Sequence, residues 1–472
     1  LTLNAGLRWE AQEIAGADGT RQIAIYDQLS PRVGLAWDPQ ARGRAKIYAN
    51  YGRFYESVPL DINDRSFSGE GFLVGKGFVG DCKRRALLPG GQPVQVAEVG
   101  PGAPCALADP RVSGGGVYAP VAPGIKGQSQ DEIVVGGQVD VGLDIVLGAY
   151  YTYRSLGNII EDLSVNGGDT FFIANPGVRP DPKVAAELDA DAQRKQAMVD
   201  STAMPDPKAA NYAAQQAAYK QLSDDAKAAK NRADVYKAVS LFPKAQREYH
   251  AVTFTVNKRL SNRFSILANY TYSRLTGNFP GPFNPYNNQL DPNITTQYDI
   301  IDLLVNRDGP LNNDRPHNFK ATGFYMQPLF GGKGTLTASL TFTALSGRPI
   351  QVLGQHTVYG ARETFILPSG SGGRTPMITQ LDAHLAYEHA LTKAVKLSVY
   401  GDVINLANQR GIINVDDEYT FSIVNPILGG RPADLRYLRP NDGGQLIVNS
   451  NYGQPTAFQA PLLLRLGGRL SF

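Results

Sequence analysis

The chain has 472 residues, with 50 glycines, 23 tyrosines and 19 phenylalanines against four methionines and two cysteines. This composition is typical of a strand-rich protein with many turns. The 46 basic and 43 acidic residues nearly cancel, and no long basic run is present, which argues against a nucleic-acid partner. No stretch approaches the roughly 20 consecutive apolar residues that a membrane-spanning helix needs. Insertion into a membrane would therefore have to use strands.

Alternating apolar and polar residues predict about twelve strands. The first strand begins at Leu1 with no initiator methionine or signal segment, so we expect the chain to be part of a longer precursor. The predicted strands cover residues 1–10, 31–38, 45–55, 131–140, 144–155, 249–259, 263–275, 315–327, 334–345, 379–388, 394–404 and 461–472.

The alternation gives each predicted strand one apolar and one polar face. Between residues 334 and 345, Leu336, Leu340 and Phe342 share one parity, and the threonines and the serine share the other. An arginine in the middle of a bilayer costs roughly 2 to 4 kcal/mol, so charges that avoid the apolar parity are informative. We expect lipid on the apolar side and a polar lumen on the other. The charged candidates for the lumen are Lys320, Asp382, Glu388, Lys396, Asp402, Arg465 and Arg469.

The lengths of the connections favour a membrane barrel over a soluble β-sandwich, which alternation alone would also fit. Short turns, such as residues 38–45 and 140–143, alternate with long excursions, such as residues 56–130 and 156–248. Outer-membrane barrels show this pattern, with turns in the periplasm and loops outside the cell. The predicted fold class is an all-β transmembrane antiparallel β-barrel in the outer membrane.

Tyrosines cluster where several predicted strands approach the long loops. Tyrosine suits the headgroup boundary, because its ring is apolar and its hydroxyl is polar. We therefore expect an outer aromatic girdle, with ordinary core tyrosines as the alternative. The candidates are Tyr51, Tyr151, Tyr153, Tyr270 and Tyr272.

The loop over residues 156–248 is expected to contain helices. Asp181-Pro182 and Asp206-Pro207 each resemble an N-cap followed by proline at the first helical position. Within the second helix, Tyr212, Tyr219 and Leu222 form an apolar stripe that could pack over the barrel mouth or meet a partner. A self-packed external decoration is the favoured alternative.

No catalytic site, metal site or cofactor site is predicted. The sequence contains no nucleophile elbow, no phosphate-binding loop and no paired-histidine zinc motif. None of the five histidines forms a spaced metal pair, and structural roles are favoured for each: His250, His317, His356, His384 and His389. Residues 416–418, Asp-Asp-Glu, lack the ligand spacing of a calcium loop, so a solvated acidic turn is favoured over a cation site.

Cys82 and Cys105 both lie in the first very long loop, amid glycine and proline. Outer-membrane proteins pass through an oxidising periplasm, which favours a disulfide over two free thiols. Such a bridge would stabilise the loop by about 3 kcal/mol. No histidine lies near the pair in the sequence, which argues against zinc.

Several segments, in this order, resemble the TonB-dependent outer-membrane receptors, and within them the Oar-like branch. The resemblance covers nearly the whole chain. Its segments are Leu29-Ser30-Pro31-Arg32-Val33-Gly34-Leu35-Ala36-Trp37, Tyr51-Gly52-Arg53-Phe54-Tyr55, Asn312-Asn313-Asp314-Arg315-Pro316-His317, Ser371-Gly372-Gly373-Arg374-Thr375-Pro376, Asp402-Val403-Ile404-Asn405-Leu406-Ala407-Asn408 and the terminal Phe472.

The resemblance implies a barrel of about 22 strands, of which this chain supplies the C-terminal part. An N-terminal plug, a TonB box and, as in Oar-like proteins, a carboxypeptidase-like regulatory domain would lie upstream, and a TonB complex would supply energy for active transport. Phe472 would be the signal read by the barrel-assembly machinery. No loop feature selects the external substrate. A surface adhesion or assembly protein without solute uptake is the alternative function.

Overall fold

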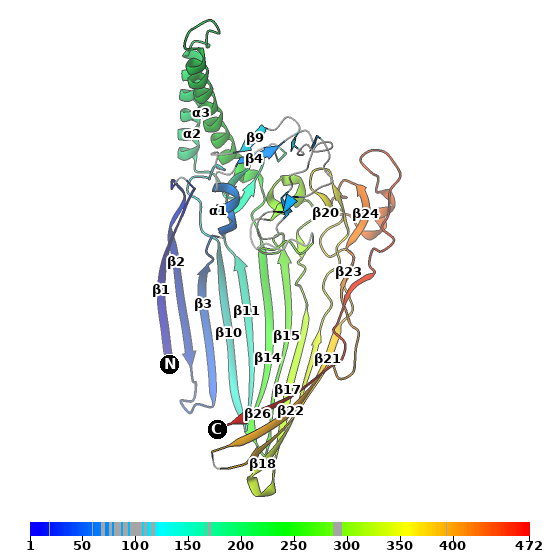
Figure 1. Ribbon diagram of the computed structural model, residues 1–472. Helices are drawn as coiled ribbons and strands as arrows, with labels where there is room; N and C mark the ends of the chain where they lie inside the picture. Colours follow the sequence, from blue (N-terminus) through cyan, green and yellow to red (C-terminus); the bar gives the residue numbers. More distant parts are fainter. Residues whose placement is uncertain are drawn as a thin grey trace.

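The computed structural model shows a curved antiparallel sheet with a layer of loops at one end (Figure 1). The structure describes residues 1–17, 19–58, 60–67, 71–74, 78–79, 86–87, 93–94, 106–107, 111–114, 119–165, 167–168, 171–286, 295–392 and 394–472. The predicted cysteine pair, Cys82 and Cys105, lies outside these residues, so the disulfide stays a prediction.

Twelve long strands form the sheet, and each pairs with its neighbours in chain order. The predicted strand number and the all-β class are confirmed. The strands are β1 (Thr2–Ala15), β2 (Arg21–Trp37), β3 (Ala45–Tyr55), β10 (Ser129–Gly142), β11 (Ile145–Leu156), β14 (Arg247–Ser261), β15 (Phe264–Gly277), β17 (His317–Leu329), β18 (Gly334–Leu345), β21 (Ile378–Ala390), β22 (Lys396–Ile404) and β26 (Leu463–Ser471). A short strand, β16 (Gly309–Pro310), also pairs with β15.

The strand register keeps the two side-chain parities apart from one strand to the next over most of the sheet, as β17, β18 and β21 show. Leu340 lies opposite Gly323 and Ala383, whereas Thr341 lies opposite Thr322 and Asp382. We call the side that carries Leu340 the apolar face and the other side the polar face. Large apolar side chains remain exposed on the strands, with Leu340 at 53% and Leu466 at 75%. This is the surface that lipid covers in an outer-membrane barrel.

Short turns join alternate strand pairs at the end of the sheet opposite the long loops (Figure 1). Leu143-Asp144 joins β10 to β11, and Asn262-Arg263 joins β14 to β15. All four residues have positive φ, between 52° and 71°. This left-handed conformation matches the twist of a tight hairpin, so these turns fix the register of the strands that they join.

The first hairpin differs from the prediction. Residues 11–30 were expected to form a loop, but β1 and β2 stay paired through most of this segment. A register shift opposite Glu10 and Gln12 places an extra residue in β2. Such a bulge reverses the parity, which hides the strand from a count of alternation. Beyond it, Ile23 and Ile25 are buried in a cluster with Ile14.

The loop layer carries the remaining elements. Its helices are α1 (Leu60–Phe67), α2 (Pro182–Ser201) and α3 (Tyr212–Ala238), with 3-10 turns η1 (Val239–Leu241), η2 (Thr296–Tyr298), η3 (Ile301–Leu304) and η5 (Pro432–Tyr437). A further 3-10 turn, η4 (Phe330–Gly332), lies instead in the short turn between β17 and β18. Its short strands are β4 (Gly71–Val74), β5 (Phe78–Val79), β6 (Ala86–Leu87), β7 (Pro93–Val94), β8 (Ala106–Leu107), β9 (Arg111–Gly114), β12 (Glu161–Leu163), β13 (Phe172–Ala174), β19 (Leu353–His356), β20 (Gly360–Phe365), β23 (Ile412–Val415), β24 (Glu418–Ile423) and β25 (Pro455–Phe458).

The helices α2 and α3 form a hairpin that rises from the loop layer (Figure 1). The Asp181 side chain caps α2 by accepting a hydrogen bond from the Lys183 amide at 2.8 Å, as predicted. The second start was misplaced, because Asp206 bonds the Lys208 amide in a separate turn and α3 begins only at Tyr212. Among the described helices, none combines the length and apolarity needed to cross a bilayer.

In the described part of the chain, the buried apolar clusters lie at the outer end of the sheet, in the loops and in the outer parts of β1 and β2. One cluster gathers Leu163, Phe172, Phe242 and Tyr298 at the base of the helical hairpin. A second, around Val352, Ile366 and Leu438, joins the later loops. The outer loops therefore have a packed interior of their own and can hold side chains in fixed positions.

Candidate functional site: the polar face and the outer rim

The seven predicted lumen residues share the polar face of β17, β21, β22 and β26. Asp402 accepts a hydrogen bond from the Arg465 guanidinium at 2.7 Å and lies 2.6 Å from His384 Nδ1. Lys396 and Glu388 form an ion pair at 2.9 Å. These pairs let charged side chains lie on one surface without repelling each other.

The other predicted lumen residues are spread along the polar face. Asp382 accepts a hydrogen bond from the Asn405 amide at 2.8 Å, and Lys320 and Arg469 are exposed. The structure thus brings Asp402, Arg465 and His384 together but does not gather all seven residues into one site. Their role as the lining of a water-filled lumen stays a prediction.

The five predicted girdle tyrosines lie on the apolar face near the outer ends of their strands. Sequence reasoning missed their partners. The Tyr151 hydroxyl lies 2.7 Å from His250 Nδ1, and the Tyr270 hydroxyl lies 2.8 Å from His317 Nδ1. The histidines therefore belong to the same aromatic band. Contact of this band with lipid headgroups stays a prediction.

The remaining histidines are separated from one another. His389 lies near the short turn before β22 and contacts Tyr387 at 2.8 Å. His384 lies farther up β21, opposite Asp402. His356 lies in the loop layer, where burial lowers its pKa.

The apolar stripe of Tyr212, Tyr219 and Leu222 is half-buried in the first half of α3. Figure 1 shows the helical hairpin rising away from the sheet, not folded over it.

The acidic turn at residues 416–418 is not solvated, and that expectation is wrong. Asp417 and Glu418 are 7% and 6% exposed. Arg348 donates to Asp417 at 3.0 Å, and Arg362 lies 3.1 Å from Asp416 and 3.4 Å from Glu418. Two arginines from the β18–β21 loop region thus neutralise the turn and hold the last long loop, to which it belongs, against the β18–β21 loop.

Other ion pairs and hydrogen bonds, each with at least one buried charged group, join further pairs of loops. Arg307 pairs with Glu363 at 3.0 Å, and Arg374 pairs with Asp314. Burial raises the pKa of Asp299 to about 9, and the negative charge of Asp162 adds to the effect. Burial also raises the pKa of Glu161 well above its ordinary value, and its side chain accepts from the Thr295 amide at 2.9 Å. Ion pairs and hydrogen bonds therefore hold the loops at the outer end together.

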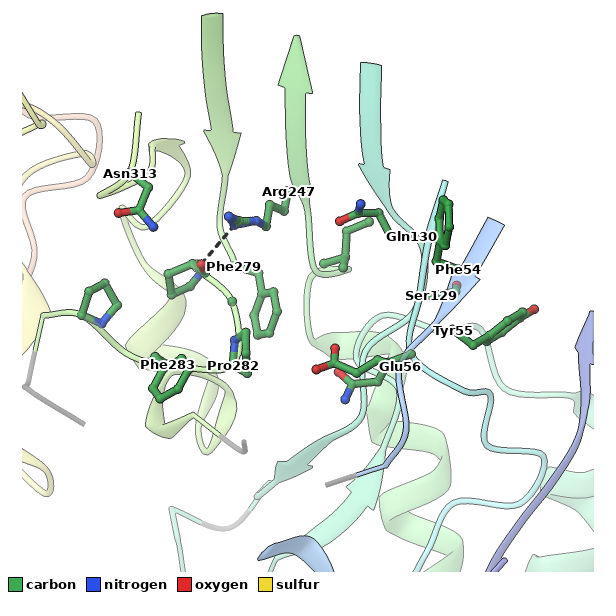
Figure 2. A pocket seen from close by; sticks show the side chains of 15 residues that line it. Phe54, Tyr55, Glu56, Ser129, Gln130, Arg247, Phe279, Pro282, Phe283 and Asn313 are labelled. Atoms are coloured by element: carbon green, nitrogen blue, oxygen red, sulfur yellow. Dashed lines mark hydrogen bonds between the residues drawn. The ribbon is translucent and has the colours of Figure 1, made fainter. Parts of the chain in front are cut away.

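A pocket of about 490 Å³ lies at the outer rim of the sheet (Figure 2). The register places Phe54, Gln130 and Leu156 side by side on three neighbouring strands, on the polar face. A proline-rich segment of the β15–β17 loop forms the opposite wall. The full lining is Phe54, Tyr55, Glu56, Gln128, Ser129, Gln130, Leu156, Arg247, Phe279, Pro280, Gly281, Pro282, Phe283, Pro285 and Asn313.

Arg247 is the basic residue of this pocket. It begins β14, and its guanidinium donates to the Pro280 carbonyl at 3.1 Å. Arg247 was not among the predicted site residues, although Phe54, Tyr55 and Asn313 belong to segments that carried the resemblance. The sequence feature that could have identified it is its position between a helical loop and the start of an alternating strand. Size, concavity and mixed chemistry make this pocket a candidate binding site.

The comparison with protein families decides the identity of the fold. Residues 13–365 match the model of the family described as "Outer membrane beta barrel domain". The chain belongs to this outer-membrane β-barrel family. Its location in the outer membrane, predicted from loop lengths and strand parity, is confirmed.

One curated relative is the TonB-dependent transporter Oar of Myxococcus xanthus, 34% identical over 507 aligned residues. The match covers 100% of this chain and 41% of the relative, so the chain spans less than half of that protein's length. The resemblance to the Oar-like TonB-dependent receptors is confirmed.

Two solved outer-membrane proteins are similar over 99% of the chain. The siderophore receptor PiuA from Acinetobacter baumannii is 10% identical, with a TM-score of 0.40 and 40% of its own chain covered. The outer-membrane transporter YddB from Escherichia coli is 12% identical, with a TM-score of 0.44 and 43% covered.

Proposed function

We propose that this chain is the C-terminal wall of a TonB-dependent outer-membrane transporter. External loops capture a substrate, and the substrate passes along the polar face through a lumen gated by a plug. The relative named as the TonB-dependent transporter Oar, similar over the whole chain, carries this proposal.

Two features of the chain support it. The polar face carries paired and exposed charges, as a water-filled passage requires, and the loops at its outer end are held by buried ion pairs. The sheet has two edges, β1 and β26, and backbone groups at an open edge are not tolerated in lipid. Closure by further strands is therefore part of the proposal.

Energy coupling tests this function. A deletion strain would be complemented with the full-length protein, in cells with and without a working TonB complex. Growth under nutrient limitation and the pattern of secreted proteins would be measured. We expect complementation only when the TonB complex works. Full complementation without it would contradict active transport.

The helical hairpin favours surface adhesion as a second candidate function. It projects beyond the other loops, where it can touch another surface (Figure 1). Replacing residues 182–238 with a short linker distinguishes the two functions. Loss of cell attachment with unchanged energy-dependent complementation would assign adhesion to the hairpin, whereas unchanged attachment would remove this candidate.

A further inference from the structure

The rim pocket combines an apolar wall with one cationic group. Phe54 and Phe283 are 39% and 47% exposed, so both rings offer surface to a ligand, although the Arg32 guanidinium lies 4.8 Å from the centroid of the Phe54 ring. Three prolines, Pro280, Pro282 and Pro285, keep the opposite wall free of charge. Gln128, Gln130 and Asn313 add amide groups at the margin. Such a surface suits a ligand with an apolar or aromatic group and a few polar atoms.

Arg247 is positioned to bind an anion. In the described part of the chain its guanidinium makes one hydrogen bond, to the Pro280 carbonyl, and no ion pair. A guanidinium carries five N–H donors, so donors remain for a ligand. Figure 2 shows Arg247 and Glu56 on opposite sides of the pocket, with Phe279 between them in the view. Glu56, the acidic residue of the pocket lining, therefore does not neutralise the charge of Arg247.

The neighbouring arginine does not compete for the same role. Arg154 forms an ion pair with Glu132 on the adjacent strand and does not line the pocket. One unpaired arginine in apolar surroundings favours a ligand with a single carboxylate, which it can bind through two parallel hydrogen bonds. A phosphate-rich ligand would require more positive charge, and a neutral glycan would leave the arginine without an anionic partner.

We propose that the rim pocket binds the free C-terminal carboxylate of a peptide whose last residues are apolar or aromatic. Arg247 binds the carboxylate, Phe54 and Phe283 contact the terminal side chains, and the amides of Gln130 and Asn313 face the peptide backbone. This inference names a substrate class and rests on the proposed transport function. The pocket volume of about 490 Å³ lies within the usual range for ligands of this size, roughly 300 to 1,000 Å³.

A pair of matched probes tests the proposal on the full-length protein purified in detergent. N-acetyl-Phe-Phe with a free carboxylate would be compared with its C-terminal amide by isothermal titration calorimetry. We expect the acid to bind about tenfold more tightly or better, because charge-assisted hydrogen bonds are roughly twice as strong as neutral ones. Equal affinity for acid and amide, or no binding of either probe, would overturn the proposal.

Variants identify the residue responsible. Arg247→Gln should remove the preference for the acid, and Phe283→Ala should weaken both probes while the preference remains. The matched control is Arg154→Gln, which should keep the wild-type preference. A preference that survives in folded Arg247→Gln protein would contradict the assignment. If Arg247→Gln does not fold, the two probes on wild-type protein still decide the ligand class.

The binding assay needs no energy source, so it separates this inference from the proposed function. Peptide binding without TonB-dependent complementation would keep the pocket and reject transport. TonB-dependent complementation without peptide binding would keep transport and reject this substrate class.

Discussion

At the residue scale, Arg348 connects more of the outer loops than its place in the sequence suggests. Its guanidinium donates to Asn312 at 2.9 Å, to the Pro349 carbonyl at 2.9 Å and to Asp417 at 3.0 Å. Three separate connections of the chain, the β15–β17, β18–β21 and β22–β26 loops, thus meet at one buried cation. Removing it would leave a buried carboxylate without its partner.

We predict that Arg348→Met destabilises the outer loops by about 3 to 5 kcal/mol, because an unpaired buried charge is costly. The measurement is the urea dependence of protease cleavage in these loops. The double variant Arg348→Met/Asp417→Leu should recover much of the loss. Arg194→Met, at an exposed ion pair on α2, is the control and should change little. Equal effects of the two single variants would contradict this role.

Asp299 should make the loop layer less stable as pH rises. Burial raises its folded-state pKa to about 9, whereas the unfolded value is about 4. Between these values the folded state holds a proton that the unfolded state releases, so stability falls across this window. Asp299→Asn should stabilise the loops by roughly 1 to 3 kcal/mol at pH 7 and leave them nearly unchanged at pH 4. Thermal unfolding at both pH values measures this, and a benefit independent of pH would refute it.

Sequence reasoning could not find these buried pairs, because their partners are distant in the chain. Arg348 and Asp417 are 69 residues apart, and Thr295 and Glu161 are 134 residues apart. Neither follows an alternation or a known motif. Residues 416–418 were misjudged for the same reason, since an acidic triplet is solvated only when no arginine from another loop covers it.

At the element scale, the strands were predictable because one physical rule acts along their whole length. A residue in a membrane-spanning strand faces either lipid or the polar face, so apolar and polar residues alternate along most of each strand. In the outer parts of the strands, beyond the membrane, this alternation is no longer required. The bulge in β2 turned Ile23 and Ile25 toward the loop core, and the prediction failed there. The turn at Asp206-Pro207 shows the same limit, because a capping pattern does not show whether a helix follows at once.

The helical hairpin should unfold separately from the sheet. Ala233 is 2% exposed on α3, and α2 packs beside this helix. Ala233→Glu would bury an unpaired charge at a cost of about 3 to 5 kcal/mol. We expect proteolysis within residues 182–238. The sheet should stay folded, which is measured as the difference in mobility between unheated and boiled samples on SDS gels. Ala228→Glu, at an exposed position of the same helix, should resist cleavage. Loss of the whole fold in the Ala233 variant would contradict this independence.

At the scale of the whole molecule, burial is distributed in the opposite way from a soluble domain. Large apolar side chains are exposed on the spanning strands, and the buried clusters lie in the loops and in the outer parts of β1 and β2. The membership of the outer-membrane barrel family explains this arrangement, since lipid covers the strands. The wall was predictable from the sequence, whereas the rim pocket was not, because it forms where β3, β10, β14 and a distant loop converge.

The central claim is that one face of the sheet contacts lipid and the other contacts water. Single cysteines along β18, in full-length protein whose native Cys82 and Cys105 are replaced by serine, test it most directly. In intact membranes, a water-soluble maleimide should label positions 337, 339, 341 and 343 and spare positions 336, 338, 340 and 342. A lipid-dissolved quencher should show the reverse pattern. Labelling that ignores parity, or that favours the leucine positions, would contradict the account.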